Sequence, residues 1–412
     1  MSEWKTYRLG EICKNVCSGG TPKSTEPSYY GGNIPWLNTK EVNFCRIDKT
    51  EKTITDSGFQ NSSTKWVEKN SVIVAMYGAT AAKVAINMIP LTTNQACCNL
   101  TIDPNLADFR FVYFYLCYKY TSLAALANGG AQQNLNAQRI KDFDITLPPL
   151  EEQKRIADIL WSLDDKIELN RRLNANLEAQ AQALFRSWFV DFEPFRDGPF
   201  VDSELGKIPA SLKIEHIGNI PHKIESGKRP KGGASEHGIP SIGAENIKGL
   251  GIYDYAKTKF IPEDFASTMK KGKINGYELL IYKDGGKPGY FIPNFTIFGE
   301  GFPYKEMYIN EHVFCLDFFD KGFNTFAYFY MRTPYIMNQL NTIGGKAAIP
   351  GINTKDIESL PIFTNENEKV KEFGTLFLPT IKTILQNCVE NKALSALRDT
   401  LLPKLMAGEI SC

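Results

Sequence analysis

Two glycine-containing loops carry side chains that can bind phosphate groups. They are residues 18–23, with the sequence SGGTPK, and residues 226–231, with the sequence SGKRPK. The side chains concerned are Thr21, Lys23, Lys228, Arg229 and Lys231. Hydroxyl, ammonium and guanidinium groups, together with backbone amides exposed beside glycine, bind phosphate oxygens in protein–DNA complexes. We therefore predict two phosphate-binding loops. A solvated charged loop is the alternative explanation of the same composition.

Other loops hold amide and amine side chains of the kind that pair with the edges of adenine and guanine. These side chains are Asn38, Lys40, Gln132, Gln133 and Asn134. Ordinary turns contain the same residue types for purely local reasons. Composition alone therefore leaves base recognition and turn formation open for each of them.

Catalytic motifs are incomplete in this chain. Residues 147–150, LPPL, have the prolines of the [DN]-P-P-[YF] methyltransferase motif but lack its first and last residues. No GxxxxGK[ST] phosphate loop occurs, and the four histidines lack metal-ligand spacing. Glu152 and Lys154 have the E-x-K spacing of metal nucleases, but glutamate is also favoured in the first turn of a helix. We expect no catalytic residue, metal or cofactor here, and a metal-dependent DNA endonuclease is the alternative.

A long helix is predicted over residues 147–192. Two prolines and two glutamates open this segment, and neither glycine nor proline occurs from Leu150 to Glu193. Proline and acidic residues suit the start of a helix. Apolar residues recur at three- and four-residue steps, and at 1.5 Å per residue the helix would be about 50–60 Å long. A single small domain cannot cover such a helix, so we predict a partner helix.

The chain repeats its own pattern in the same order in its second half. Residues 9–12 and 18–23 correspond to residues 217–220 and 226–231. Residues 129–131 correspond to 344–346, and Asp142-Phe143 corresponds to Asp356-Ile357. Ser241 stands where the first half has Trp36. Repetition at half the chain length indicates two related domains, each followed by a helical segment.

The second helical segment, residues 363–412, is the predicted partner helix. Proline inside a helix removes a hydrogen bond, so Pro379 predicts a kink or break, and Gly374 weakens the helix further. The repeat order predicts antiparallel packing of the two helices as a coiled coil. Asn170 and Asn174 interrupt the apolar stripe of the first helix. They would fix the register of the coiled coil if they lie at its seam, and face solvent otherwise.

These elements predict an α+β protein of two mixed α/β domains separated by two long helices in an antiparallel coiled coil. The boundaries are residues 1–146 for domain 1, 147–192 for the central helix and 193–210 for a linker. Residues 211–362 form domain 2, and 363–412 form the C-terminal helical region. Two divergent domains on a rigid spacer suit a DNA target whose groove faces recur at fixed intervals. A structural coiled-coil scaffold is a further alternative, but it needs no such domains.

Overall composition limits the possible classes of protein. The chain of 412 residues has 43% hydrophobic and 23% charged residues and a net charge of +1, which fits a globular protein with ample core. A near-neutral charge means that any DNA-binding surface must be local. No segment has the composition of a signal peptide or membrane span, and the nine cysteines are scattered. We expect a cytoplasmic protein with free thiols.

Several motifs together resemble the specificity (S) subunit of type I restriction-modification enzymes. The most specific is LPPLEEQKRIA at residues 147–157, followed by LDDKI at 163–167. GGTP at 19–22, IPW at 34–36 and LPKLMAGEI at 402–410 complete the resemblance, which spans the whole chain. The resemblance implies a noncatalytic DNA-binding subunit in which two target-recognition domains each read one half of a bipartite site. The helices would set the spacer between the two halves.

The resemblance also implies partners. Two modification subunits would dock on the helices and bring S-adenosylmethionine for adenine methylation, and restriction subunits would bring ATP and Mg²⁺ chemistry. Glu152, Arg155, Arg171, Trp188 and Phe189 are the expected partner contacts. Trp36, Asn246 and Lys346 join the residues above as expected contacts to double-stranded DNA.

Overall fold

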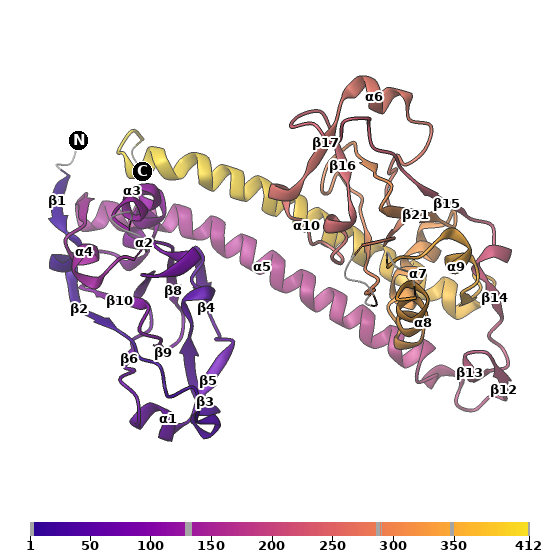
Figure 1. Ribbon diagram of the computed structural model, residues 1–412, viewed down its shortest axis with the longest axis horizontal. Coiled ribbons are helices and arrows are strands. Elements are labelled where there is room, and N and C mark those ends of the chain that lie inside the picture. The colour runs from indigo at the N-terminus through magenta and orange to yellow at the C-terminus, as the bar shows by residue number, and fades with distance from the viewer. Residues whose placement is uncertain (1–3, 128–133, 286–288, 290, 347–349, 411–412) are drawn as a thin grey trace. The chain divides into compact units, whose positions relative to one another are not determined.

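A computed structural model describes residues 4–127, 134–285, 289, 291–346 and 350–410 of the chain (Figure 1). The chain divides into two compact units. Unit 1 comprises Met1–Asp165 with Ser395–Cys412, and unit 2 comprises Lys166–Leu394. Each unit therefore contains one predicted globular domain and a segment of both long helices.

Unit 1 is built on two larger β-sheets and a two-stranded sheet of β1 and β11. One of the larger sheets has the strand order β2-β10-β7-β8-β4, and the other has the order β5-β3-β9-β6. Because β7 and β8 consist largely of valine, isoleucine and alanine, they are buried throughout at the centre of the unit. The strands are β1 (Lys5–Arg8), β2 (Cys13–Ser18), β3 (Tyr30–Leu37), β4 (Cys45–Ile47), β5 (Lys52–Ile54), β6 (Trp66–Val67), β7 (Val72–Ala75), β8 (Val84–Asn87), β9 (Leu91–Thr93), β10 (Cys97–Ile102) and β11 (Asp144–Leu147).

Short helices cover the sheets of unit 1. They are α1 (Asp56–Gln60), α2 (Phe109–Tyr118), α3 (Tyr120–Ala125) and α4 (Ala137–Lys141). The aromatic helix α2 buries Phe111 and Phe114 in the same core as residues of β7 and β10. Ile156 and Leu160 of the first long helix enter that core as well. The long helix is thus anchored to domain 1 by apolar burial.

Unit 2 repeats this architecture with other side chains. Its main sheets have the orders β15-β21-β18-β19 and β17-β16-β20, and a separate hairpin joins β12 to β13. The strands are β12 (Phe200–Ser203), β13 (Gly206–Pro209), β14 (Ile214–His216), β15 (Lys223–Ser226), β16 (Ile239–Ile242), β17 (Lys259–Ile261), β18 (Leu279–Tyr282), β19 (Phe295–Ile297), β20 (Tyr308–Ile309), β21 (Val313–Asp317) and β22 (Pro361–Phe363). The helices are α6 (Glu263–Thr268), α7 (Lys321–Met331), α8 (Pro334–Gly344) and α9 (Thr354–Glu358).

The strand registers confirm the internal repeat. In unit 1 the parallel pair β3–β9 sets Trp36 opposite Thr92, and in unit 2 the parallel pair β16–β20 sets Ser241 opposite Tyr308. The amide of Asn94 donates to the Leu37 carbonyl at 3.0 Å, as the amide of Asn310 donates to the Ile242 carbonyl at 2.9 Å. Ser241 is therefore the structural counterpart of Trp36, as the sequence predicts.

One predicted correspondence within the repeat is wrong. The amide of Leu9 donates to the carbonyl of Phe143, and the amide of Ile217 donates to that of Leu360, both at 2.9 Å. Phe143 therefore corresponds to Leu360 and not to Ile357. Strand pairing sets this register, whereas a two-residue sequence match is too short to do so.

The two long helices are α5 (Leu150–Phe189) and α10 (Glu368–Met406), within the predicted segments (Figure 1). Inside unit 2 they run antiparallel, because Lys166 pairs with Glu390 at 3.2 Å while Asn174 contacts Ile384 and Cys388. Inside unit 1, Asp164 near the unit boundary of α5 accepts a 2.8 Å hydrogen bond from Arg398 of α10.

Asn170 and Asn174 lie at the helix seam of unit 2, so the solvent-facing alternative is wrong. Asn170 is 1% exposed, and its Nδ2 donates to Glu390 Oε2 at 2.7 Å and to Asn391 Oδ1 at 2.9 Å. Asn174 Oδ1 accepts a 2.8 Å hydrogen bond from Asn387. Buried polar groups of this kind favour the one alignment in which all of them are hydrogen-bonded.

The predicted interruption of the C-terminal helix is also wrong. α10 is continuous through Pro379. Proline lacks the N–H that would bond to the carbonyl one turn earlier, but Pro379 is exposed, so water can bond to that carbonyl instead. Gly374 has a packing role instead: a Cβ added there would lie 2.5 Å from the carbonyl oxygen of Gly322 in α7. The glycine lets α10 approach α7 closely. Among the described helices, none is long and apolar enough to cross a membrane.

Candidate nucleic-acid interface

In unit 1, polar residues from three strand ends meet at one edge. Asn38 follows β3 and caps the next turn, its Oδ1 accepting from the Lys40 amide at 3.2 Å. Thr80, which lies beyond β7, donates to the Thr39 carbonyl at 3.1 Å. Asn94, directly after β9, donates to Thr39 Oγ1 at 3.5 Å. These bonds hold the loops together as one polar surface on a rigid sheet.

The first glycine loop packs against the same edge. The Gly20 amide donates to the Thr93 carbonyl at 2.9 Å, and a Cβ added at Gly19 would lie only 2.0 Å from that oxygen. The glycine is therefore required for the close approach. Thr21 donates its hydroxyl hydrogen to Oε1 of Gln95, a side chain that is exposed although its neighbours are buried. Lys23 is exposed in the same loop.

The other residues of unit 1 that were predicted to contact DNA differ in their surroundings. Lys40 is exposed and forms an ion pair with Glu51, whose carboxylate raises the pKa of the lysine. Asn134 is exposed and bridges to Tyr77, itself 40% exposed. Gln132 and Gln133 lie outside the described residues.

Trp36 does not belong to this surface, so the prediction of a DNA contact is corrected. It is 4% exposed, and its indole Nε1 donates to the Gly20 carbonyl at 2.9 Å. It packs with Ile34 and Ile54. The indole therefore supports the glycine loop from beneath, where its apolar ring is buried and its N–H is satisfied.

The corresponding edge of unit 2 carries charged groups. Arg229 Nε lies 3.3 Å from Glu311 Oε1, and His312 Nε2 lies 3.3 Å from the same oxygen. The other ring nitrogen of His312 bonds to Asp284, which follows β18. Lys283 Nζ donates to the Glu311 carbonyl at 3.1 Å. Charged side chains from three loops thus form one network.

Asn246 is a second correction. It is 1% exposed, and its Oδ1 accepts from the Gly243 amide at 2.9 Å, closing the turn after β16. Burial prevents a direct contact with DNA.

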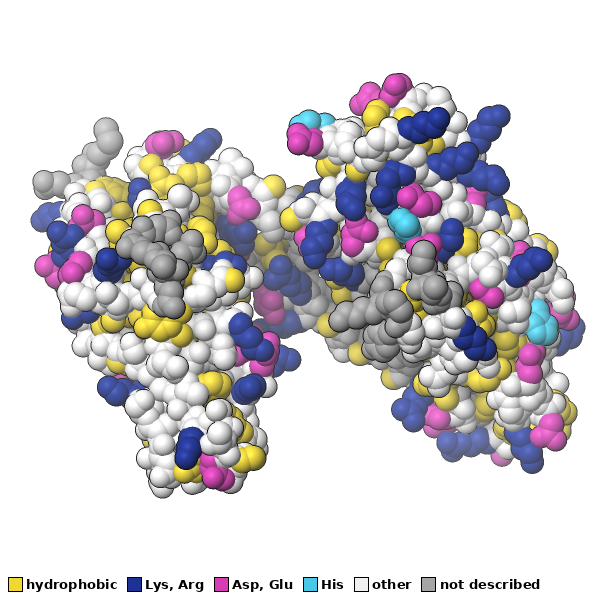
Figure 2. All heavy atoms as spheres, in the orientation of Figure 1, with side chains coloured by type: hydrophobic (Ala, Val, Ile, Leu, Met, Phe, Trp, Pro, Cys, Tyr) yellow, Lys and Arg dark blue, Asp and Glu magenta, His cyan; other side chains and the backbone are white. Residues whose placement is uncertain are grey.

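Lys228, Lys231 and Lys346 are exposed and form no ion pair with another described residue. Figure 2 shows basic and acidic side chains mixed over α6 and β17, and mainly uncharged atoms over α1 and β3.

The predicted partner contacts lie along α5. Arg155 and Arg171 are exposed, and Glu152 is half-buried. Trp188 is partly buried, with the Lys369 ammonium 4.7 Å from its ring centroid. Phe189 is 4% exposed and packs on Phe326 within the core of unit 2, so its prediction as a partner contact is corrected.

The sequence-based predictions missed Gln95 and Glu311. Both directly follow an asparagine that ends a buried strand, Asn94 in one half and Asn310 in the other. The sequence pattern that indicates these two residues is an asparagine followed by Gln or Glu in both halves. The residues around this pattern differ between the halves, so the repeat is not evident there from the sequence. No group of three His, Cys, Asp or Glu residues in the described ranges could hold a metal ion.

Comparisons with known proteins agree with this architecture. The family model described as type I restriction modification DNA specificity domain matches residues 1–179. The MjaIX specificity subunit of Methanocaldococcus jannaschii is 28% identical, with 99% of this chain and 94% of that protein covered. The HindI specificity subunit of Haemophilus influenzae is 24% identical over all of both chains.

A solved structure shares the fold. The S subunit of a type I restriction-modification system from M. genitalium superposes with a TM-score of 0.62 at 18% identity, covering 98% of this chain and 96% of that one. Residues 1–179 thus match the type I restriction modification DNA specificity domain, and the whole chain is similar to the specificity subunits of type I restriction enzymes.

Proposed function

We propose that each unit reads one half of a bipartite DNA sequence through the loop edge at the ends of its central strands. One observation carries this proposal: the same framework joins its loops through uncharged side chains such as Thr21 and Gln95 in unit 1 and through charged side chains in unit 2. Base edges are distinguished by their donor and acceptor patterns, so two chemically different edges would select two different half-sites. The result is an asymmetric site.

The chain serves recognition and leaves catalysis to other subunits. Its relatives are named specificity subunits of type I restriction enzymes, which are DNA-recognition components. We infer that two modification subunits dock along α5 and α10, where Arg155 and Arg171 are exposed. Those subunits would bind S-adenosylmethionine, and restriction subunits would use ATP and Mg²⁺. The continuous helices suit a fixed spacer between the half-sites because a helix has a constant rise per residue.

Exchange of one domain tests this proposal. Residues 1–146 are replaced by the equivalent domain of a relative, and the assembled modification complex is expressed in a host without adenine methylation of its own. Long-read sequencing then maps the methylated sites. We expect one half-site to change while the other half-site and the spacer length are retained. A change in both half-sites would overturn the assignment of one domain to one half-site.

A further inference from the structure

The two units contain a matched pair of side chains at equivalent positions. Thr21 donates a hydrogen bond to Gln95 in unit 1, and Arg229 forms an ion pair with Glu311 in unit 2. Each pair joins the glycine loop to the residue that follows the terminal asparagine of a parallel strand.

The surrounding backbone confirms that the positions are equivalent. A Cβ added at Gly19 would lie 2.0 Å from the Thr93 carbonyl oxygen, and one at Gly227 would lie 1.6 Å from that of Ile309. Asn94 Oδ1 accepts from the Ala96 amide at 3.2 Å, and Asn310 Oδ1 accepts from the His312 amide at 2.8 Å. Both loops are therefore pressed onto the same strand end, which fixes the two paired side chains.

The pair in unit 1 leaves the Gln95 amide able to bind a base. Its Oε1 accepts from Thr21, which occupies one of two lone pairs and fixes the orientation of the amide. The second lone pair and the two N–H groups have no partner among the described residues. An amide with one acceptor and one donor side by side matches N6 and N7 of adenine.

The pair in unit 2 presents a guanidinium instead. Glu311 contacts Arg229 through the arginine Nε, which leaves the terminal nitrogens without an ion pair to another described residue. His312 contacts the same carboxylate oxygen, while Glu311 Oε2 is enclosed without a hydrogen-bond partner. One carboxylate oxygen is thus enclosed by the protein, and the other lies beside the arginine and orients it. A fixed guanidinium fork matches O6 and N7 of guanine.

We propose that the glycine-loop residue and the residue after the asparagine together read one base in each domain. Gln95 selects adenine in one half-site, and Arg229 selects guanine in the other. This proposal rests on the function proposed above. Thr21 and Glu311 are positioning residues that hold the reading side chains. The recognition difference between the halves then depends on two residues per domain carried by a common backbone.

Reciprocal exchange of the pairs tests the proposal in the complete modification complex. One variant carries T21R and Q95E, and the other carries R229T and E311Q. Methylation-site mapping is expected to show one adenine position changed to guanine in one half-site for the first variant. The second variant is expected to show the reverse change in the other half-site. Retained methylation of an unchanged sequence by both variants would overturn the proposal.

If an exchanged pair abolishes methylation, the variant Arg229→Lys tests the proposal instead. Lysine keeps the charge but loses the planar fork, so preference for guanine over other bases at one position should fall by roughly tenfold or more. Methylation rates on duplexes substituted at each position measure this preference. Equal discrimination by the variant and the natural protein would overturn the proposal.

The matched control is Lys231→Thr, in the same loop but outside the pair. It should weaken binding on all sequences alike and leave base preference unchanged, as loss of a phosphate contact does. Sequence-selective loss in the control would contradict the assignment of the pair.

If the natural complex methylates no bipartite site, the proposed function itself fails. If it does so and the exchanged variants keep that site, only the base-reading assignment fails.

Discussion

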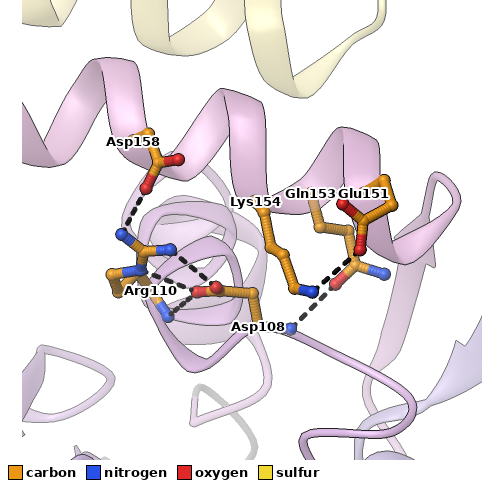
Figure 3. A network of polar contacts seen from close by, with 6 residues as sticks. All are labelled: Asp108, Arg110, Glu151, Gln153, Lys154 and Asp158. Carbon is orange, nitrogen blue, oxygen red and sulfur yellow. Dashed lines mark hydrogen bonds and ion pairs between the residues drawn. The ribbon is translucent and has the colours of Figure 1, made fainter.

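The two long helices begin in equivalent places and both pack on an apolar core, yet their other buried contacts near these starts differ. Near the start of α5 in unit 1 a polar network joins the helix to the start of α2 (Figure 3). Near the start of α10 in unit 2 an aromatic cluster surrounds Phe373. In both units the long helix packs on a shorter helix that follows an inner strand of the main sheet, α2 after β10 in one and α7 after β21 in the other. The comparison shows that topology was retained while the interactions that stabilise it were replaced.

The polar anchor depends on directed hydrogen bonds. Gln153 is 1% exposed; its Oε1 accepts from the Asp108 amide at 3.1 Å, and its Nε2 donates to the Pro148 carbonyl at 2.9 Å. Arg110 bonds to both oxygens of Asp108 and to Asp158 at 2.5 Å, and the Asp108 carboxylate raises the pKa of the arginine. Such bonds fix the helix at one angle and one register.

The aromatic anchor depends on packing. The centroid of the Phe373 ring lies 5.4 Å from the ring centroid of Phe185, 5.5 Å from that of Phe329 and 4.6 Å from that of Phe377. The Phe373 side chain is fully buried. Gly374, on the adjacent position of α10, allows the close approach to α7. Burial of large rings contributes more free energy than a net hydrogen bond, but it is less directional.

Phe373→Ala should have the largest effect. Loss of a fully buried phenyl ring leaves a cavity and should lower the free energy of unfolding of unit 2 by about 3–5 kcal/mol. Urea unfolding followed by near-ultraviolet circular dichroism measures it. Leu376→Ala, at a 52% exposed position of the same helix, is the control and should change stability by less than about 0.5 kcal/mol. Equal losses in both variants would refute the aromatic anchor.

Gln153→Met should have an intermediate effect. Methionine fills the same volume but leaves the Asp108 amide and the Pro148 carbonyl buried without partners. The expected loss is about 1–3 kcal/mol, measured as the urea midpoint of unit 1. Lys154→Met, which removes only a partly exposed ion pair with Glu151, should be close to neutral. An unchanged midpoint for Gln153→Met would show that the network does not anchor the helix.

Asp158→Asn should have the smallest effect. The carboxylate side chain is 64% exposed, and Arg110 keeps its paired bonds to Asp108. The expected loss is about 0.2–1 kcal/mol at low salt and should disappear at high salt, where exposed charges are screened. Thermal unfolding at both salt concentrations measures it. A salt-independent loss as large as that of Gln153→Met would reverse the ranking within the network.

Sequence patterns predicted most of the framework. The breaker-free segment before Glu193 predicted α5, and the repeat predicted two domains and an antiparallel partner helix. Periodicity succeeds here because a helix repeats its buried face every few residues, whatever the individual side chains are. The rule that proline interrupts a helix failed at Pro379, where an exposed position allows solvent to replace the missing hydrogen bond.

The recognition residues were only partly predictable. The glycine loops were identified from composition, but Trp36 proved to be a buried support of the first loop. Asn246 proved to close the turn after β16, and Phe189 proved to be a core residue. Residue type indicates which hydrogen bonds a side chain can make and says nothing of its exposure. Exposure depends on packing between segments that lie far apart in the sequence.

The sequence by itself determined the repeat, the long helices and the resemblance to type I specificity subunits, because each depends on patterns that are local or recur along the chain. Only the tertiary structure decided which side chains share a surface. Thr21 meets Gln95, and Arg229 meets Glu311, across about 70 to 80 residues of chain, because glycine lets each loop press against a strand end. That pairing comes from strand register and close backbone contact, which no linear pattern of residue types records.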